Sequence, residues 1–186
     1  MRVFLLLLGF LFGAASARPE ARIENLQVTL EADEVVAAFR LAGAFGEQLR
    51  ERIQSGLPTG IVYELELLRD RKRWYDRGLA DSTLQVVAMF NAVNREYLVN
   101  FKLDGRLVES RVLHDLAEVE RAMTEISALP TFSLAGMPSS RRLLLRARAE
   151  LGSRTWLLFI PTRVYTGWRE SRKFRPPGPA TGPAVR

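Results

Sequence analysis

Three runs of alternating apolar residues between Ile61 and Leu113 constrain the fold most strongly, because a period of two places each run on one face of a strand. The apolar positions are Ile61, Tyr63, Leu65, Leu67, Leu84, Val86, Ala88, Phe90, Tyr97, Val99, Phe101 and Leu103. Asp104-Gly105 follows the third run and predicts a tight hairpin, since a type I′ turn needs positive φ at both central residues. We therefore expect an antiparallel sheet with one shared apolar face.

The same alternation predicts further strands on both sides of this region. An opening hairpin is expected over residues 26–41, and a strand with one solvent-exposed face is expected over 143–151. Gly152-Ser153 predicts a turn, and residues 156–165 a strand interrupted at Pro161, because proline prefers a sheet edge or a bulge.

Two stretches change to helical spacing. Phe45, Leu49 and Ile53 lie at i, i+4 and i+8, which places them on one stripe of a helix. A second helix is predicted after Asp115, which with Glu118 has the spacing of a capping box. The first helix should stop at Gly56 and Pro58, and the second near Ser127 before Pro130. Residues 78–82 and 128–140 are predicted connections. The expected fold is α+β, an antiparallel sheet or two-layer β-sandwich of about seven to nine strands with two packed helices.

The first 17 residues, Met1–Ala17, have the pattern of a signal peptide. Arg2 precedes an apolar run, and Ala15-Ser16-Ala17 matches a small-x-small cleavage site. The apolar run is shorter than the roughly 20 residues of a membrane span, although an uncleaved anchor is the alternative. We expect cleavage near Ala17, a single globular domain over 18–170, a disordered Pro- and Gly-rich tail over 171–186, and a periplasmic or otherwise extracytoplasmic location.

The amino-acid composition limits the chemistry and the partners that the protein can have. The chain has no cysteine, which excludes disulfides and thiolate chemistry. Its net charge is +6, or +5 once Arg2 is removed with the signal segment. Such a charge permits attraction to acidic partners, but a solvated basic surface is the simpler interpretation. Outside the cytoplasm, nucleic acid is not an expected partner.

No catalytic, cofactor-binding or metal-ligating set is visible. His114 is the only histidine, and no zinc-protease, phosphate-loop or nucleophile-elbow motif occurs. Glu64 and Glu66 are two apart on one strand, roughly 7 Å by strand rise, so a carboxylate hydrolase is one hypothesis. Strands with one wet face often carry such residues, however, and we expect a protein that is not an enzyme.

A basic and aromatic set is the candidate partner surface. Its residues are Arg69, Arg71, Arg73, Trp74, Tyr75, Arg142, Arg146 and Arg148. Charged side chains at a strand end can protect a sheet edge from pairing with other chains. The alternative is a docking surface for an acidic partner.

The order of these features resembles the DUF4390 family of exported bacterial proteins. The resemblance rests on the segments Leu49–Pro58, Ile61–Tyr75, the Tyr97 strand, Leu116–Ile126 and Arg141–Leu151, with Trp156 and Trp168 near the end. It implies an export signal and a β-rich domain, and family genes that often neighbour a membrane sensor kinase of the nitrogen-regulation type. It implies no functional residues.

We therefore expect one function and weigh an alternative from a different class. The first is a non-enzymatic protein-interaction module of the cell envelope, with a sensor-kinase ectodomain as the kind of partner that the resemblance implies. The second is a carrier of a small apolar molecule or lipid, because alternation cannot distinguish a filled core from a lined cavity.

Overall fold

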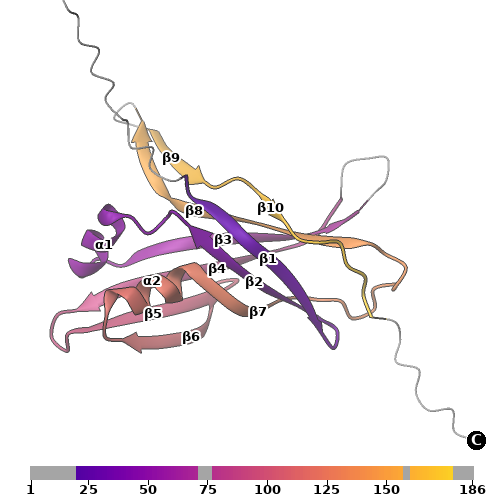
Figure 1. Cartoon of the computed structure of the whole chain (residues 1–186), viewed down its shortest axis with the longest axis horizontal. Helices are drawn as coiled ribbons and strands as arrows, with labels where there is room; N and C mark the ends of the chain where they lie inside the picture. Colours follow the sequence, from indigo (N-terminus) through magenta and orange to yellow (C-terminus); the bar gives the residue numbers. More distant parts are fainter. Residues whose placement is uncertain (1–19, 71–76, 157–159, 178–186) are drawn as a thin grey trace, which may run out of the picture.

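The alternating runs form the centre of a seven-stranded antiparallel sheet. The computed structural model describes residues 20–70, 77–156 and 160–177. The central strands are β3 (Thr59–Arg69), β4 (Arg77–Asn91), β5 (Glu96–Leu103) and β6 (Arg106–Leu113). On the other side of β3 lies β8 (Leu143–Trp156), with which both β9 (Ile160–Tyr165) and β10 (Arg169–Glu170) pair. The order is β10-β8-β3-β4-β5-β6, so β6 is an edge strand (Figure 1).

A second sheet of three strands lies across the apolar face of the first. It contains β1 (Arg22–Glu31), β2 (Glu34–Ala42) and β7 (Glu125–Ser133), in the order β1-β2-β7. β1 lies against β8 and β7 against β4. The predicted opening hairpin is β1–β2, and Ala32 at its turn has a φ of 50°. The predicted Asp104-Gly105 hairpin joins β5 to β6, with φ of 48° and 79° at the two turn residues.

The two predicted helices are present and lie at the same end of the sandwich (Figure 1). α1 (Glu47–Gln54) follows β2, and α2 (Leu116–Thr124) connects β6 to β7. Asp115 caps α2, since its Oδ1 accepts a 2.7 Å hydrogen bond from the Glu118 N–H. Glu118 Oε2 in turn accepts from the His114 N–H at 3.2 Å. α2 packs against β4, β5 and β6 of the larger sheet and against β2 and β7 of the smaller one.

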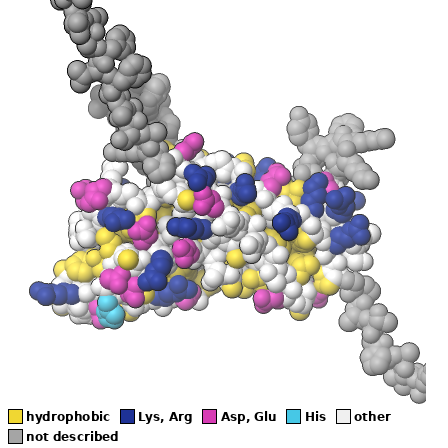
Figure 2. All heavy atoms as spheres, in the orientation of Figure 1, with side chains coloured by type: hydrophobic (Ala, Val, Ile, Leu, Met, Phe, Trp, Pro, Cys, Tyr) yellow, Lys and Arg dark blue, Asp and Glu magenta, His cyan; other side chains and the backbone are white. Residues whose placement is uncertain are grey.

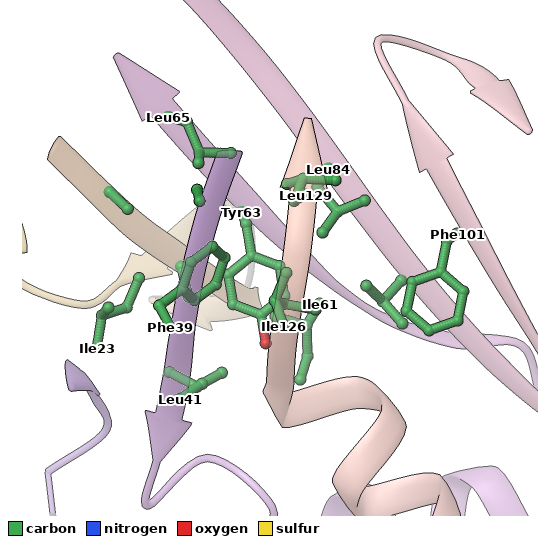
Figure 3. Packing of buried hydrophobic residues seen from close by; sticks show 14 of the residues in the cluster. Ile23, Phe39, Leu41, Ile61, Tyr63, Leu65, Leu84, Phe101, Ile126 and Leu129 are labelled. Carbon is green, nitrogen blue, oxygen red and sulfur yellow. The ribbon is translucent and has the colours of Figure 1, made fainter. Parts of the chain in front are cut away.

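One continuous apolar core lies between the layers. Tyr63, Leu65 and Val86 are fully buried at its centre. The Tyr63 ring meets Phe39 of β2 edge-on, with centroids 5.1 Å apart (Figure 3). Each large side chain buried here contributes about 1.5–3 kcal/mol relative to exposure. The α+β sandwich that the pattern predicted is therefore confirmed.

The predicted link over 78–82 and the predicted turn at Gly152-Ser153 are wrong, because strands occupy both positions. β4 already begins at Arg77, and its first residues pair with the end of β3 in place of a link over 78–82. Ser82 is buried there, and its hydroxyl donates a hydrogen bond to the Asp104 carboxylate. This part of β4 is polar in sequence, so its alternation did not predict a strand. The predicted turn at Gly152-Ser153 is a bulge within β8, where Gly152 has a φ of 99° and the register with β9 shifts.

The long connection predicted over 128–140 is also wrong in its first part. β7 runs through Pro130, and α2 accordingly ends at Thr124 rather than near Ser127. Among the described strands, β7 pairs with β2 alone, and proline is tolerated on an edge strand because its missing N–H can face away from the partner.

The first residues of the predicted tail lie against β8. Ser171 and Phe174 both donate backbone hydrogen bonds to β8, to the carbonyls of Leu145 and Leu143. Pro176 is still buried. The rest of the tail, 178–186, and the predicted signal segment lie outside the described residues.

Candidate interaction surface

Basic side chains from three distant segments meet where β3 ends and β8 begins. The set, which we call the basic end, is Arg69, Arg141, Arg142, Arg172, Lys173 and Arg175. The Asp70 N–H donates to the Arg142 carbonyl at 2.9 Å, which joins the first two segments. Leu143 and Phe174 exchange two 2.9 Å backbone hydrogen bonds, which add the third. Figure 2 shows Lys and Arg side chains gathered at the end from which the C-terminal trace leaves.

Asp70 is the acidic residue at the centre of the basic end. Its side chain is only 10% exposed. Its carboxylate accepts a 2.9 Å hydrogen bond from Lys173 Nζ and lies 3.5 Å from Arg142 Nε. Residues 69–70, 141–143 and 171–175 contain six cationic side chains and no acid besides Asp70. The surplus positive charge is available to an acidic partner, because Arg69, Arg172 and Arg175 are exposed.

The predicted partner surface is divided by the structure. Arg69 and Arg142 belong to the basic end. Four further candidates, Arg71, Arg73, Trp74 and Tyr75, lie outside the described residues. Arg146 and Arg148 lie farther along β8, on the outer face of the sheet.

Arg146 and Arg148 form ion pairs within the protein. The register sets Glu64 opposite Arg148 and Glu66 opposite Arg146 on neighbouring strands. Arg148 Nη2 lies 2.6 Å from Glu64 Oε2, and Arg146 Nη2 lies 2.6 Å from Glu66 Oε2. All four side chains are roughly one-third exposed or less. We call these four residues the Arg–Glu row.

Two aromatic rings cover the Arg–Glu row. The Arg146 guanidinium lies 4.3 Å from the centroid of Trp168, and that of Arg148 lies 4.4 Å from the same ring. Arg148 also lies 4.1 Å from the Tyr165 ring. Such cation–π contacts stabilise by about 0.5–2 kcal/mol each. The Arg–Glu row therefore holds Tyr165, at the end of β9, and Trp168 against the outer face of the sheet.

The residues considered for catalysis have structural partners. Glu64 and Glu66 are each held by an arginine, and His114 is exposed beside the cap of α2. Within the described ranges, no group of three His, Asp or Glu side chains is placed to hold a metal ion. In the same ranges, no helix is long and apolar enough to cross a bilayer.

A groove opens between the edges of the two sheets. It has a volume of about 220 Å³ and lies between β6 and β7. Phe101, Ile126 and Leu129 form apolar parts of its wall, and Glu109, Arg111 and Glu125 add charge. Arg111 Nε donates a 2.7 Å hydrogen bond to Glu109 Oε1. The Arg111 guanidinium lies 4.7 Å from the centroid of the Phe101 ring. The hydrogen bond from Arg111 holds the pKa of Glu109 below its usual range.

Sequence reasoning missed the C-terminal half of the basic end and the groove. Arg172, Lys173 and Arg175 follow no periodic pattern, so only Phe174 among prolines and charges hinted at a contact. The Arg–Glu row did leave a signal, because glutamates spaced by two in β3 match arginines spaced by two in β8.

The match to known proteins covers most of the chain. A family model described as a domain of unknown function, DUF4390, matches residues 18–156. The chain belongs to the DUF4390 family. No curated protein and no solved structure matches it. For this DUF4390 protein the family match includes Arg69 and the Arg–Glu row, whereas Trp168 and residues 172–175 of the basic end lie beyond it.

Proposed function

We propose that this DUF4390 protein is a non-enzymatic interaction module of the cell envelope that binds an acidic segment of another protein through its basic end. The observation that carries the proposal is the convergence of three segments, which together carry six cationic side chains and one nearly buried carboxylate that contacts two of them. The arrangement keeps exposed arginines close together, which favours multiple charge-assisted contacts to carboxylates.

The setting of this function is also a proposal. The signal-like segment Met1–Ala17 supports an extracytoplasmic location, and an ectodomain of a membrane sensor kinase is the kind of partner that we favour. Acidic loops of such an ectodomain would supply the charge that the basic end lacks.

Photo-cross-linking in intact cells tests the proposal. A photoreactive residue at Ser140, which is exposed beside Arg141, should give a discrete adduct whose partner mass spectrometry identifies. Charge reversal by Arg69→Glu, Arg172→Glu and Arg175→Glu together should abolish the adduct. A matched control, Arg52→Glu, Arg95→Glu and Arg121→Glu, changes the net charge equally at exposed positions outside the basic end and should preserve it. Equal adducts from both triple variants would refute the proposal.

Binding to anionic lipid is the outcome that would replace the protein partner. Vesicles containing phosphatidylglycerol, mixed with the purified protein, provide the comparison. Vesicle binding that depends on the basic end, without any protein adduct, would assign this surface to the membrane instead.

The groove between β6 and β7 supports a second candidate, a carrier of a small amphiphilic molecule. Its apolar wall and its charged rim suit such a ligand. Its volume of about 220 Å³ is below the roughly 300–1,000 Å³ of ordinary ligand pockets, so it favours a short molecule over a lipid. Native mass spectrometry of the protein from its own cells should show a reproducible mass excess if this second function holds, and a bare mass would count against it.

A further inference from the structure

Within the described residues, one side of the β6 backbone and several of its apolar side chains have no cover. It is the last strand of the seven-stranded sheet, so half of its N–H and C=O groups face away from β5. Leu107, Val108 and Val112 are exposed by 59%, 55% and 55%. These are three of the five exposed large hydrophobic residues among the described ones, and they share one strand. Exposed apolar residues concentrated in this way mark an interaction site.

The charges of β6 restrict what can pair with that edge. Glu109 and Arg111 both face the groove, where Arg111 lies over the Phe101 ring. Charged residues on the inward face of an edge strand oppose pairing with an arbitrary strand. Glu109 and Arg111 already form an ion pair with each other, and a strand with a cation opposite Glu109 and an anion opposite Arg111 would extend this pair.

A second copy of β6 has the required charges when it runs antiparallel about Ser110. In this register Ser110 faces its own copy, Glu109 faces Arg111 of the other chain, and Arg111 faces Glu109. A register shift against β5 leaves Val108 as an extra residue, so the pairing is considered only for the regular part of the strand from Glu109 onward. Opposite charges placed directly across a strand pair stabilise it.

The neighbouring registers lack this complementarity. A shift by one pair in one direction sets Glu109 against Glu109, and in the other direction Arg111 against Arg111. Like charges directly opposite destabilise a strand pair. A shift of the pairing by a single residue would put residues of opposite faces together. The sequence of β6 therefore favours one two-fold register, and disfavours the others.

We propose that two copies of this protein associate through β6, which pairs antiparallel about Ser110 and joins the two seven-stranded sheets into one. This contact is isologous, so each copy uses the same patch, as in most homodimers. β6 contributes no residue to the basic end. The proposed dimer can therefore be tested independently of the proposed function.

Two complementary charge variants test the register directly. Arg111→Glu leaves two acids in each strand and Glu109→Arg leaves two bases, so each variant alone should dimerise about tenfold or more weakly, in sedimentation equilibrium of the protein expressed from its full coding sequence. An equimolar mixture of the two should form a heterodimer, since every charge then meets its opposite. Failure of the mixture to associate, while both variants stay folded by circular dichroism, would overturn the proposal.

A cysteine at the axis provides a second, independent measurement. The chain contains no cysteine, so Ser110→Cys introduces a single thiol. Directly opposed residues in an antiparallel pair have Cα atoms about 4.5–5.5 Å apart, which is within disulfide range. Mild oxidation should give a covalent dimer, whereas Val93→Cys, at a position 91% exposed in the β4–β5 turn, should stay monomeric. Equal cross-linking of both variants, or of neither, would contradict the two-fold pairing at Ser110.

Discussion

Tyr63 Oη donates a 2.6 Å hydrogen bond to the carbonyl oxygen of Met123, across 60 residues of sequence. Tyr63 stands in the middle of β3, and Met123 is in the last turn of α2. The carbonyls of a last helical turn have no partner within the helix. This hydrogen bond satisfies one of them inside the core, and fixes the point at which α2 gives way to β7 above the sheet (Figure 3).

Loss of this hydroxyl should cost stability without loss of the fold. Tyr63→Phe leaves the Met123 carbonyl buried without its donor, so the free energy of unfolding in urea should fall by about 1–3 kcal/mol. Tyr97→Phe is the control, because Tyr97 is buried but its hydroxyl makes no hydrogen bond within the described residues. A loss from Tyr97→Phe as large as that from Tyr63→Phe would contradict the assigned role.

Alkaline pH should weaken the protein through the same residue. Burial raises the pKa of Tyr63 well above its usual value. The unfolded chain releases this proton near pH 10, whereas the folded protein retains it, so above about pH 10 the unfolded state binds fewer protons and stability falls as pH rises. Unfolding free energies measured from neutral pH upward should show this decline, and Tyr63→Phe should make it shallower. An identical slope in the variant would exclude Tyr63 as the cause.

The Arg–Glu row should show measurable coupling between its partners. A double-mutant cycle with Glu64→Gln and Arg148→Gln should give an interaction energy of about 1 kcal/mol, at the upper end for partly exposed pairs, because Trp168 and Tyr165 hold the guanidinium in place. The same cycle on Arg40 and Glu125 should give a value near zero, because that pair is 3.7 Å apart and more than half exposed. Equal coupling in both cycles would mean that the rings contribute nothing.

The sequence predicted the parts of the fold that strict alternation or a cap defines. Ile61 to Leu113 carries four strands of the larger sheet, and Asp115 caps α2 as its spacing indicated. β7 was not predictable in this way, because Pro130 interrupts it and a proline in an apolar run normally ends a strand. It is a strand only because β2 provides the hydrogen-bonding partner and its own outer edge stays open.

The candidate surface was predictable only where it coincided with a strand. Arg69 and Arg142 stand at the ends of two recognisable strands, so their charge pattern was visible. Lys173 contacts Asp70 across a sequence separation of 103 residues, and its segment is positioned by the Leu143–Phe174 pairing. A contact of this kind depends on tertiary structure rather than on any local pattern.

The most direct measurement of the central proposal is the dissociation constant of the complex between the purified protein and its cross-linked partner at low and high salt. If the basic end binds carboxylates, affinity should fall as ionic strength rises. The variant with Arg69→Glu, Arg172→Glu and Arg175→Glu should bind about tenfold or more weakly and lose most of this salt dependence. The control reversing Arg52, Arg95 and Arg121 should bind like the unmodified protein. An affinity unchanged by salt and by the basic-end variant would show that the partner binds elsewhere.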